Sequence, residues 1–289
     1  MRVGTATISS THGFDAYCRN AEDNTGAVER ICVALDVGLE MHDAFDARSI
    51  DGPTRLDVVL PLLKAWIARK AELAPKTQWG LVVLRDADAE LLLAPTERDI
   101  MLATLNSVAH PRPRPADGFE EEDDAAADAP FDFASLFRVL GEAFGGTRPD
   151  GSVNRCVVVF GRSRAVPVAT GGFDLKSDVQ FFLNAIYVHE KAAPPVRDVQ
   201  AIYNALLKLV KHRGSYAMET TSSRQRLESH LLLLLAHPIL RDSQDAALAK
   251  LDPEEAQRAA TPPPVAPSLQ RAVSPPPVAP PLSPPPPGA

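Results

Sequence analysis

The sequence predicts a three-layer α/β/α domain, built on a mostly parallel sheet and followed by a proline-rich tail. Four short runs are apolar and rich in β-branched residues, without the alternation of a half-exposed strand, which is typical of parallel strands covered on both faces. Amphipathic helical patterns lie between these runs, so the connections are expected to be right-handed crossovers. Of the 27 prolines, 13 fall in the last 29 residues, and such a segment enters neither a helix nor the interior of a sheet.

Each element is justified by its own pattern. The four runs predict central strands at Ile31–Leu35, Leu81–Leu84, Val157–Phe160 and Ile186–Val188, and Glu90–Leu93 is expected to be a short antiparallel arm or edge strand. Helical stripes of apolar residues lie within 56–67, 133–144, 199–209 and 227–235. Pro61 interrupts the first stripe and predicts a kink or a late start of that helix.

The domain organisation follows from composition. Residues 1–26 show no periodicity and are expected to form a flexible N-terminal arm, and residues 27–240 form the domain. Within it, residues 110–130 combine Pro-Arg alternation with an acidic block and predict a mobile surface insertion. Residues 241–289 are assigned to a disordered proline-rich tail, whose one internal repeat is a pair of Pro-Pro-Pro-Val-Ala-Pro segments.

Charge and composition exclude several classes of function. The formal net charge is −7, and seven acids lie between 117 and 128, so the remainder of the chain is neutral overall. A nucleic-acid-binding protein carries a basic excess, which is absent, so we expect no direct nucleic-acid partner. The longest apolar run, 231–236, is far short of the roughly 20 residues that span a bilayer, and the N-terminus lacks the apolar core of a signal peptide. Three separate cysteines suit a reducing compartment, so we expect a soluble intracellular protein.

The first predicted strand ends in Asp36-Val37-Gly38-Leu39-Glu40, at the edge of the sheet where ligands bind in α/β folds. The position is similar to the metal-ion-dependent adhesion site of von Willebrand factor A domains, where an Asp-x-Ser-x-Ser run holds a divalent cation. Here Gly38 and Glu40 replace both serines. Arg162, after the later strand, would repel a cation and is expected to pair with the Asp36 carboxylate instead. We therefore expect a degenerate metal site and no cofactor.

Other candidates for chemistry are weaker. Ser163 on a strand-to-helix turn, with His189 after the next strand, suggests a nucleophile, but the second glycine of a G-x-S-x-G elbow is Ala165 and no acid is clearly placed. A serine at this position is more often a turn or cap residue. Cys32 and Cys156 lie inside apolar strands and are expected to be buried, inert thiols. We therefore expect a protein that is not an enzyme.

Several segments together resemble one von Willebrand A-like family over about residues 29–241. They are Glu29–Asp36, Gly80–Leu84, Phe133–Phe137, Phe181-Phe182 leading to Ile186–His189, Gly214-Ser215-Tyr216, and the closing Leu-Leu-Ala-His-Pro of 234–238. The family is the scaffold subunit shared by the BRISC and BRCA-one-A deubiquitinase complexes, also called the mediator of Rap-eighty interactions and targeting. The acid-and-proline insertion and the long tail depart from its better-known animal members.

The resemblance implies a function and partners. It implies a non-catalytic scaffold, in nucleus and cytoplasm, of a complex that cuts ubiquitin chains linked through lysine sixty-three, with a role in the DNA damage response. The implied partners are a BRE-like subunit with ubiquitin-conjugating-variant domains, an Abraxas-type scaffold and a JAMM-type zinc deubiquitinase. The alternative is a free von Willebrand A-type binding module outside any such complex.

Candidate partner contacts lie near the end of the domain and in the tail. The helix ending in five leucines is apolar around most of its circumference, which leaves Leu232 and Leu233 for a partner, unless the helix is wholly buried in its own domain. His237 and Pro238 follow it. The tail offers Pro-x-x-Pro spacings that suit grooves reading polyproline II, with a solubilising linker as the alternative; these spacings are Pro264 to Pro267 and Pro277 to Pro280.

Overall fold

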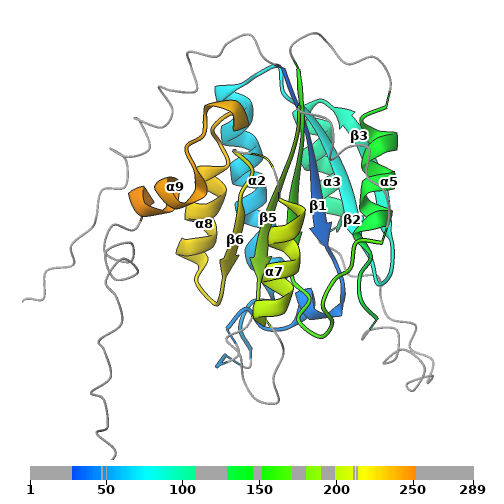
Figure 1. Ribbon diagram of the computed structural model, residues 1–289, viewed down its shortest axis with the longest axis vertical. Coiled ribbons are helices and arrows are strands. Elements are labelled where there is room, and N and C mark those ends of the chain that lie inside the picture. The colour runs from blue at the N-terminus through cyan, green and yellow to red at the C-terminus, as the bar shows by residue number, and fades with distance from the viewer. Residues whose placement is uncertain are drawn as a thin grey trace, which may run out of the picture. The chain divides into compact units, whose positions relative to one another are not determined.

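The computed structural model describes residues 28–46, 48–49, 51–108, 129–145, 152–170, 180–189, 199–210, 212 and 214–251. They contain a six-stranded sheet in the order β3-β2-β1-β4-β5-β6 (Figure 1). The strands are β1 (Glu29–Asp36), β2 (Gln78–Leu84), β3 (Ala89–Thr96), β4 (Val153–Phe160), β5 (Phe181–Val188) and β6 (Ala217–Thr220). Neighbouring strands pair in parallel except β2 and β3, which are antiparallel. The predicted mostly parallel α/β fold is confirmed, with β3 as the expected antiparallel edge.

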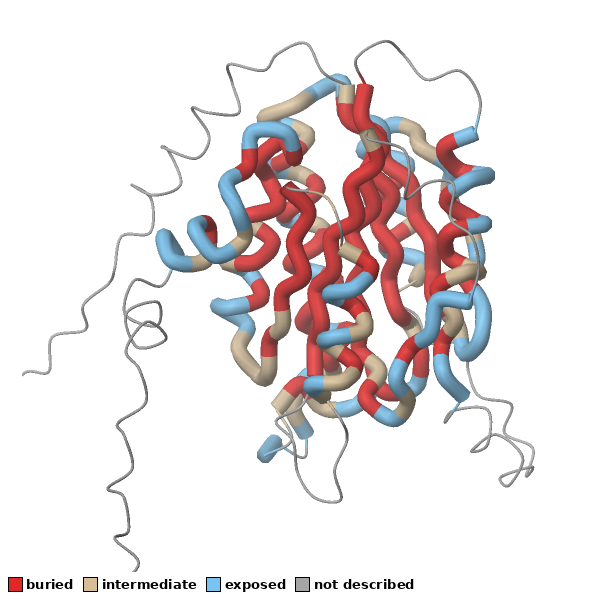
Figure 2. Tube along the Cα trace, in the orientation of Figure 1, coloured by how far each residue is buried: buried red, intermediate tan, exposed pale blue. Residues whose placement is uncertain are grey.

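Helices cover both faces of the sheet and complete three layers (Figure 1). The core of one face includes residues of α2 (Arg55–Leu73), α3 (Arg98–Val108), α8 (Arg224–Leu233) and α9 (Gln244–Leu251), and that of the other includes residues of α5 (Phe133–Ala143) and α7 (Val199–Leu209). In β1, Ile31 and Val33 face the first core, and Cys32 and Ala34 face the second. Figure 2 shows the central strands buried along their length, which explains their continuous apolar runs.

The strand order reverses at the centre of the sheet. From β1 the chain proceeds to β2 and β3 on one side, and from β4 to β5 and β6 on the other. The carboxyl ends of β1 and β4 are therefore neighbours at the point where the order reverses, the usual ligand position in open α/β sheets. The residues after these two strands form the candidate site.

Helix α2 begins earlier than the sequence suggested. The Thr54 hydroxyl accepts from the Asp57 backbone amide at 3.1 Å, and the Asp57 carboxylate accepts from the Thr54 amide at 2.9 Å. This capping box starts the helix at Arg55, and the helix continues through Pro61. The predicted late start is wrong. The reciprocal cap and the burial of one face of α2 stabilise the helix by more than the loss of the backbone hydrogen bond that Pro61 cannot donate.

The described domain also extends beyond the predicted boundary at 240. Arg241 is buried, and α9 follows the short helix η2 (Pro238–Leu240), so the assignment of residues 241–251 to a disordered tail is corrected. Strand β6 and helix α9 were not predicted. The predicted arm 1–26, residues 110–128 of the insertion and the proline-rich segment after 251 lie outside the described residues. Among the described helices, none has the length and hydropathy to span a membrane.

Candidate functional site at the carboxyl edge of the sheet

Asp36 ends β1 where the strand order reverses, and its side chain is completely buried. The Gly38 amide donates to its Oδ1 at 3.0 Å, and the Gly161 amide donates to its Oδ2 at 3.0 Å. The carboxylate is therefore held from both flanking turns, one after β1 and one after β4. Burial raises the pKa of Asp36, whereas Arg162 and these two amides oppose that rise.

Arg162 binds this carboxylate directly. Its Nε donates to Oδ1 and Oδ2 of Asp36 at 3.1 and 3.3 Å. The outer nitrogens of the same guanidinium donate to the backbone carbonyls of Arg85, at 2.7 Å, and Asp86 in the turn after β2. The guanidinium also lies 4.8 Å from the ring centroid of Phe131. The predicted pairing of Arg162 with Asp36 is confirmed, and one side chain joins the turns after three strands.

Gly38 makes room for the guanidinium. A Cβ at this position would lie 3.2 Å from Asp36 Oδ1 and 3.5 Å from Arg162 Nε. The absence of a side chain at Gly38 therefore leaves the Asp36 carboxylate uncrowded where it pairs with Arg162.

Glu40 forms a second buried carboxylate site beside the first. Its Oε1 accepts from the backbone amides of Ser163, at 2.8 Å, and Arg164, at 3.1 Å. Its Oε2 accepts from the Ser163 hydroxyl and lies 3.9 Å from Arg55 Nη1, which also donates to the Gly161 carbonyl at 2.8 Å. Asp36 and Glu40 therefore each lie within ion-pair distance of an arginine and accept hydrogen bonds from backbone amides. Among the described residues, no group of three His, Cys, Asp or Glu side chains could hold a metal ion.

The nucleophile hypothesis for Ser163 is not supported by this geometry. The hydroxyl of Ser163 carries one hydrogen and donates it to Glu40. His189 stacks on Tyr187 with 4.6 Å between ring centroids and lies 3.6 Å from the Glu219 carboxylate. Ser163 is a turn residue that orders Glu40. Cys32 and Cys156 are buried as predicted, and burial raises the pKa of Cys32 to about 12.

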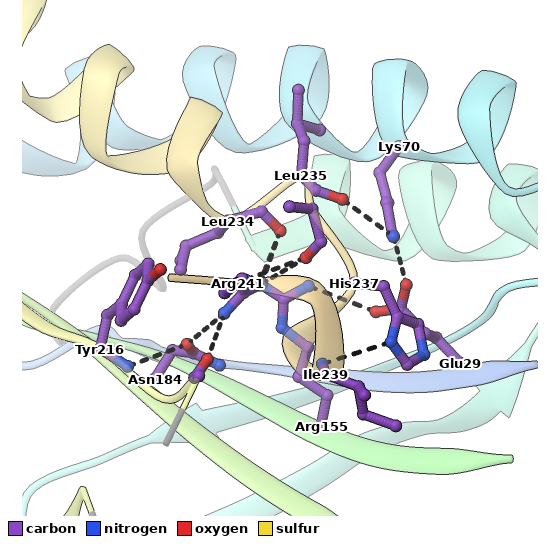
Figure 3. Close-up of polar contacts among 12 residues, drawn as sticks. Glu29, Lys70, Arg155, Asn184, Tyr216, Leu234, Leu235, His237, Ile239 and Arg241 are labelled. Atoms are coloured by element: carbon purple, nitrogen blue, oxygen red, sulfur yellow. Dashed lines mark hydrogen bonds and ion pairs between the residues drawn. The ribbon is translucent and has the colours of Figure 1, made fainter. Parts of the chain in front are cut away.

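A second polar cluster, at the amino-terminal side of the sheet, was missed by the sequence analysis (Figure 3). Buried Glu29 on β1 accepts from Lys70 of α2 and, at 3.3 Å, from Arg155 of β4. Burial disfavours the ionised carboxylate, but Lys70 and Arg155 outweigh it and hold the pKa of Glu29 below its usual value. The signal was present in the sequence, because a charged residue within an otherwise apolar strand must find a partner.

The same cluster secures the chain after α8. The carbonyls of Leu234 and Leu235 accept from Arg155, at 2.6 Å, and Lys70, at 3.0 Å. Arg241 donates to the Leu234 and Ala236 carbonyls at 3.0 and 2.8 Å, and to Asn184 Oδ1 at 2.8 Å (Figure 3). The cations thus bond the backbone carbonyls of the segment that follows α8.

This arrangement corrects the predicted partner contacts. Leu233, His237 and Pro238 are buried within the chain's own domain, because α8 packs onto the sheet and the cationic cluster holds the segment after it. Leu232 is partly buried against the same core. The four tail prolines of the Pro-x-x-Pro spacings lie outside the described residues. The exposed apolar side chains of this region are instead the next two, Ile239 at 61% and Leu240 at 42%.

Comparisons with known proteins give similarity in structure alone. No family model matches the chain, and no curated protein matches it. Similar solved structures include the SpRpn10 VWA domain, at 17% identity and a TM-score of 0.45, covering 72% of this chain and 96% of that one. They also include the conserved hypothetical protein BatB from Bacteroides thetaiotaomicron, at 12% identity and a TM-score of 0.43, with 71% and 98% covered. Likenesses of this size carry no assignment of function.

Proposed function

We propose that the chain is a non-catalytic scaffold subunit of a multi-subunit deubiquitinase complex of the BRISC or BRCA-one-A type. Its partners are then a BRE-like subunit with ubiquitin-conjugating-variant domains, an Abraxas-type scaffold and a JAMM-type zinc deubiquitinase, which cuts chains linked through lysine sixty-three. The proposal places the chain in nucleus and cytoplasm, in ubiquitin signalling and the DNA damage response.

The observation that carries the proposal is the occupation of the carboxyl edge by Arg162. In a metal-dependent binding module this edge presents a cation to the ligand, whereas here the positive charge is internal and is neutralised by Asp36. Glu40 is similarly enclosed by the amides of the turn after β4. These contacts hold the carboxyl edge of the sheet in one arrangement. A rigid domain without an exchangeable ligand suits a scaffold.

The residues that carry the family resemblance support the proposal from a second direction. Glu29 begins the first resembling segment, Tyr216 ends another, and Leu234 begins the last. These three segments converge in the cluster of Figure 3, where Tyr216 donates its amide to Asn184 and stacks under Arg241, with 5.2 Å to its ring. Three of the six resembling segments therefore meet in one cluster, which holds the segment that carries Ile239 and Leu240.

The proposal assigns the partner contact to this exposed pair. Two adjacent branched aliphatic side chains on a segment anchored by Arg241 form a preordered apolar contact, which needs little further ordering on binding. In an Ile239→Asp, Leu240→Asp variant the two carboxylates would be desolvated in such an interface. The cost of burying these unpaired charges would weaken partner binding.

The test is retention of a BRE-like subunit on the tagged full-length chain at high salt. We expect the Ile239→Asp, Leu240→Asp variant to lose the partner while its thermal unfolding stays within a few degrees of the parent. Leu207→Asp on α7 is the matched control, because Leu207 is 45% exposed and lies on the opposite face. Equal retention by both variants would reject this contact, and a monodisperse monomer that retains no partner would favour the free binding module.

The proline-rich tail is a separate candidate contact. Truncation after Leu251 removes Pro264, Pro267, Pro277 and Pro280 and leaves α9 intact. If the tail is a docking strap for a ubiquitin-conjugating-variant domain, the partner is lost from a folded chain. An unchanged complex would identify the tail as a solubilising linker.

A further inference from the structure

The segment that carries Ile239 and Leu240 begins with a histidine cap. Helix η2 starts at Pro238, which has no backbone amide hydrogen, so the first amide of this helix is that of Ile239. The Nδ1 atom of His237 accepts a hydrogen bond from this amide at 3.4 Å (Figure 3). The imidazole therefore satisfies an amide that the first turn of a helix leaves without a backbone partner.

The cap requires one protonation state of the imidazole. Nδ1 accepts through its lone pair, so the hydrogen of the neutral His237 ring lies on Nε2. Nε2 is buried and has no hydrogen-bond partner among the described residues. A second proton on Nδ1 would turn this atom into a donor that faces the Ile239 amide, which is also a donor. In this arrangement the protonated ring has two N–H groups, and the described contacts offer an acceptor to neither.

The surroundings of His237 also disfavour its protonated form. Burial holds the pKa of His237 below its usual value, three cations act in the same direction, and one carboxylate opposes them. These charged groups come from four parts of the fold: Glu29 on β1, Lys70 on α2, Arg155 on β4 and Arg241 after η2. The folded segment therefore binds a proton at His237 less tightly than the same segment does when it opens to water.

We propose that His237 is a pH-sensitive switch on the apolar contact formed by Ile239 and Leu240. The neutral ring caps η2 and holds the two side chains in place. A proton transferred from solvent to Nδ1 breaks the hydrogen bond from the Ile239 amide and frees the segment. The inference rests on the proposed function, because it concerns the regulation of the partner contact assigned to this pair.

The direction of the pH dependence follows from the lowered pKa of His237. The open segment takes up the proton near the ordinary histidine pKa of 6.5, whereas the folded segment takes it up only at lower pH. The cap is therefore fully effective above pH 6.5 and is lost as the pH falls through the folded pKa. Because one proton is involved, the opening equilibrium changes by at most about tenfold per pH unit.

Two other groups titrate on the acid side and must be separated from His237. The pKa of Glu29 is held below 4.5, so this carboxylate changes its charge at lower pH. Burial lowers the pKa of His230 to about 4, and this residue lies on α8, so its protonation acts on unfolding of that helix. A local readout at η2 is therefore required, with an amide of α8 as the reference.

The test is amide hydrogen exchange of the full-length chain between pH 5 and 7, measured residue by residue by NMR. The results are expressed as protection factors, which remove the intrinsic pH dependence of exchange. We expect the protection of Ile239 and Leu240 to fall below pH 6.5 relative to that of Leu231 in α8. The decrease should approach about tenfold per pH unit.

Three variants separate the cap from the titration. His237→Asn supplies a side-chain acceptor that does not titrate, so the protection of Ile239 should persist and be independent of pH. His237→Ala supplies no acceptor, so protection should be low throughout. His42→Asn replaces an exposed histidine of η1 (Leu39–His42) and is the matched control, which should keep the parent's pH dependence. Protection of the parent that does not change with pH, or an unaltered pH dependence in His237→Asn, would overturn the proposal.

Partner retention provides a second readout. The tagged parent should lose the BRE-like subunit when the wash is changed from pH 7 to pH 5.5, whereas retention by His237→Asn should be the same at both pH values. Equal loss from both proteins at pH 5.5 would contradict the switch. The exchange measurement needs no partner, so absence of the subunit at pH 7 would reject the proposed function, and amide exchange alone would then decide the switch.

Discussion

Replacing Arg162 by methionine tests the physical basis of the carboxyl edge. Methionine keeps an unbranched side chain but removes the guanidinium, leaving Asp36 buried with the amides of Gly38 and Gly161 as its remaining donors among the contacts described above. Breaking a buried ion pair by removing one partner costs about 3–5 kcal/mol. For a domain of this size the melting temperature should fall by roughly 6–20 °C.

The pH dependence identifies the cause of that loss. Burial already raises the pKa of Asp36 and Arg162 opposes the rise, so the variant should have a higher folded-state pKa than the parent. A raised pKa means that the folded state binds the proton more tightly than the unfolded state, so stability is lost as the pH rises through the folded pKa. The difference in unfolding free energy between parent and variant should therefore be larger at pH 7 than at pH 5.

The assay is urea unfolding of both proteins at the two pH values, with a double variant as control. Asp36→Asn in the Arg162→Met background removes the unpaired charge and should recover part of the stability, about 0.5–3 kcal/mol as a coupling free energy. A loss below about 0.5 kcal/mol for Arg162→Met, the usual range for surface substitutions, would refute the reasoning. So would a loss that is the same at pH 5 and pH 7.

Three further predictions follow from the same geometry. Calorimetric titration of the parent with magnesium or manganese should give no heat above dilution, because Arg162 occupies the Asp36 carboxylate, and a specific affinity tighter than about millimolar would contradict this. Gly214→Ala should cost at least about 1–2 kcal/mol in unfolding free energy, since Gly214 has φ +91° and a Cβ would lie 2.1 Å from the Pro238 carbonyl. Its control is Gly141→Ala in α5, where a Cβ meets nothing within 4 Å and a gain of about 0.5–1 kcal/mol is expected. The lowered pKa of Glu29 contributes stability above pH 4.5 that is lost as the pH falls through the folded pKa, and Lys70→Met should reduce this acid-side loss in urea unfolding measured from pH 3 to 7.

The central strands were predictable because their signal is local. Both faces of β1, β4 and β5 are covered, so each reads as a continuous apolar run. Strand β6 has four residues, Ala-Met-Glu-Thr, and α9 has eight without a strong apolar stripe, so neither gives a local pattern. Both are fixed by tertiary contacts, for example by Gln244, whose side-chain amide bonds the amide and carbonyl of Ala217 at 2.8 and 2.6 Å.

Part of the candidate site was likewise predictable from the sequence, and part was not. Asp36 and Arg162 were predictable as a pair because strand ends in a parallel sheet meet at one edge. The surroundings of Arg241 were not, because its partners Asn184, Gly214 and Leu234 are distant in the chain or belong to turns without a sequence signature. The leucine run misled the prediction, because α8 ends at Leu233 and the following residues turn inward under Arg241.

Co-purification of the tagged full-length chain from its own cells tests the central claim most directly. The wash contains high salt and a chelator, and the retained proteins are identified and counted by mass spectrometry. We expect stoichiometric retention of a subunit with ubiquitin-conjugating-variant domains, unaffected by the chelator, because Arg162 rather than an exchangeable cation neutralises Asp36. Recovery of a monodisperse monomer, or of a partner released by the chelator and restored by magnesium, would contradict it.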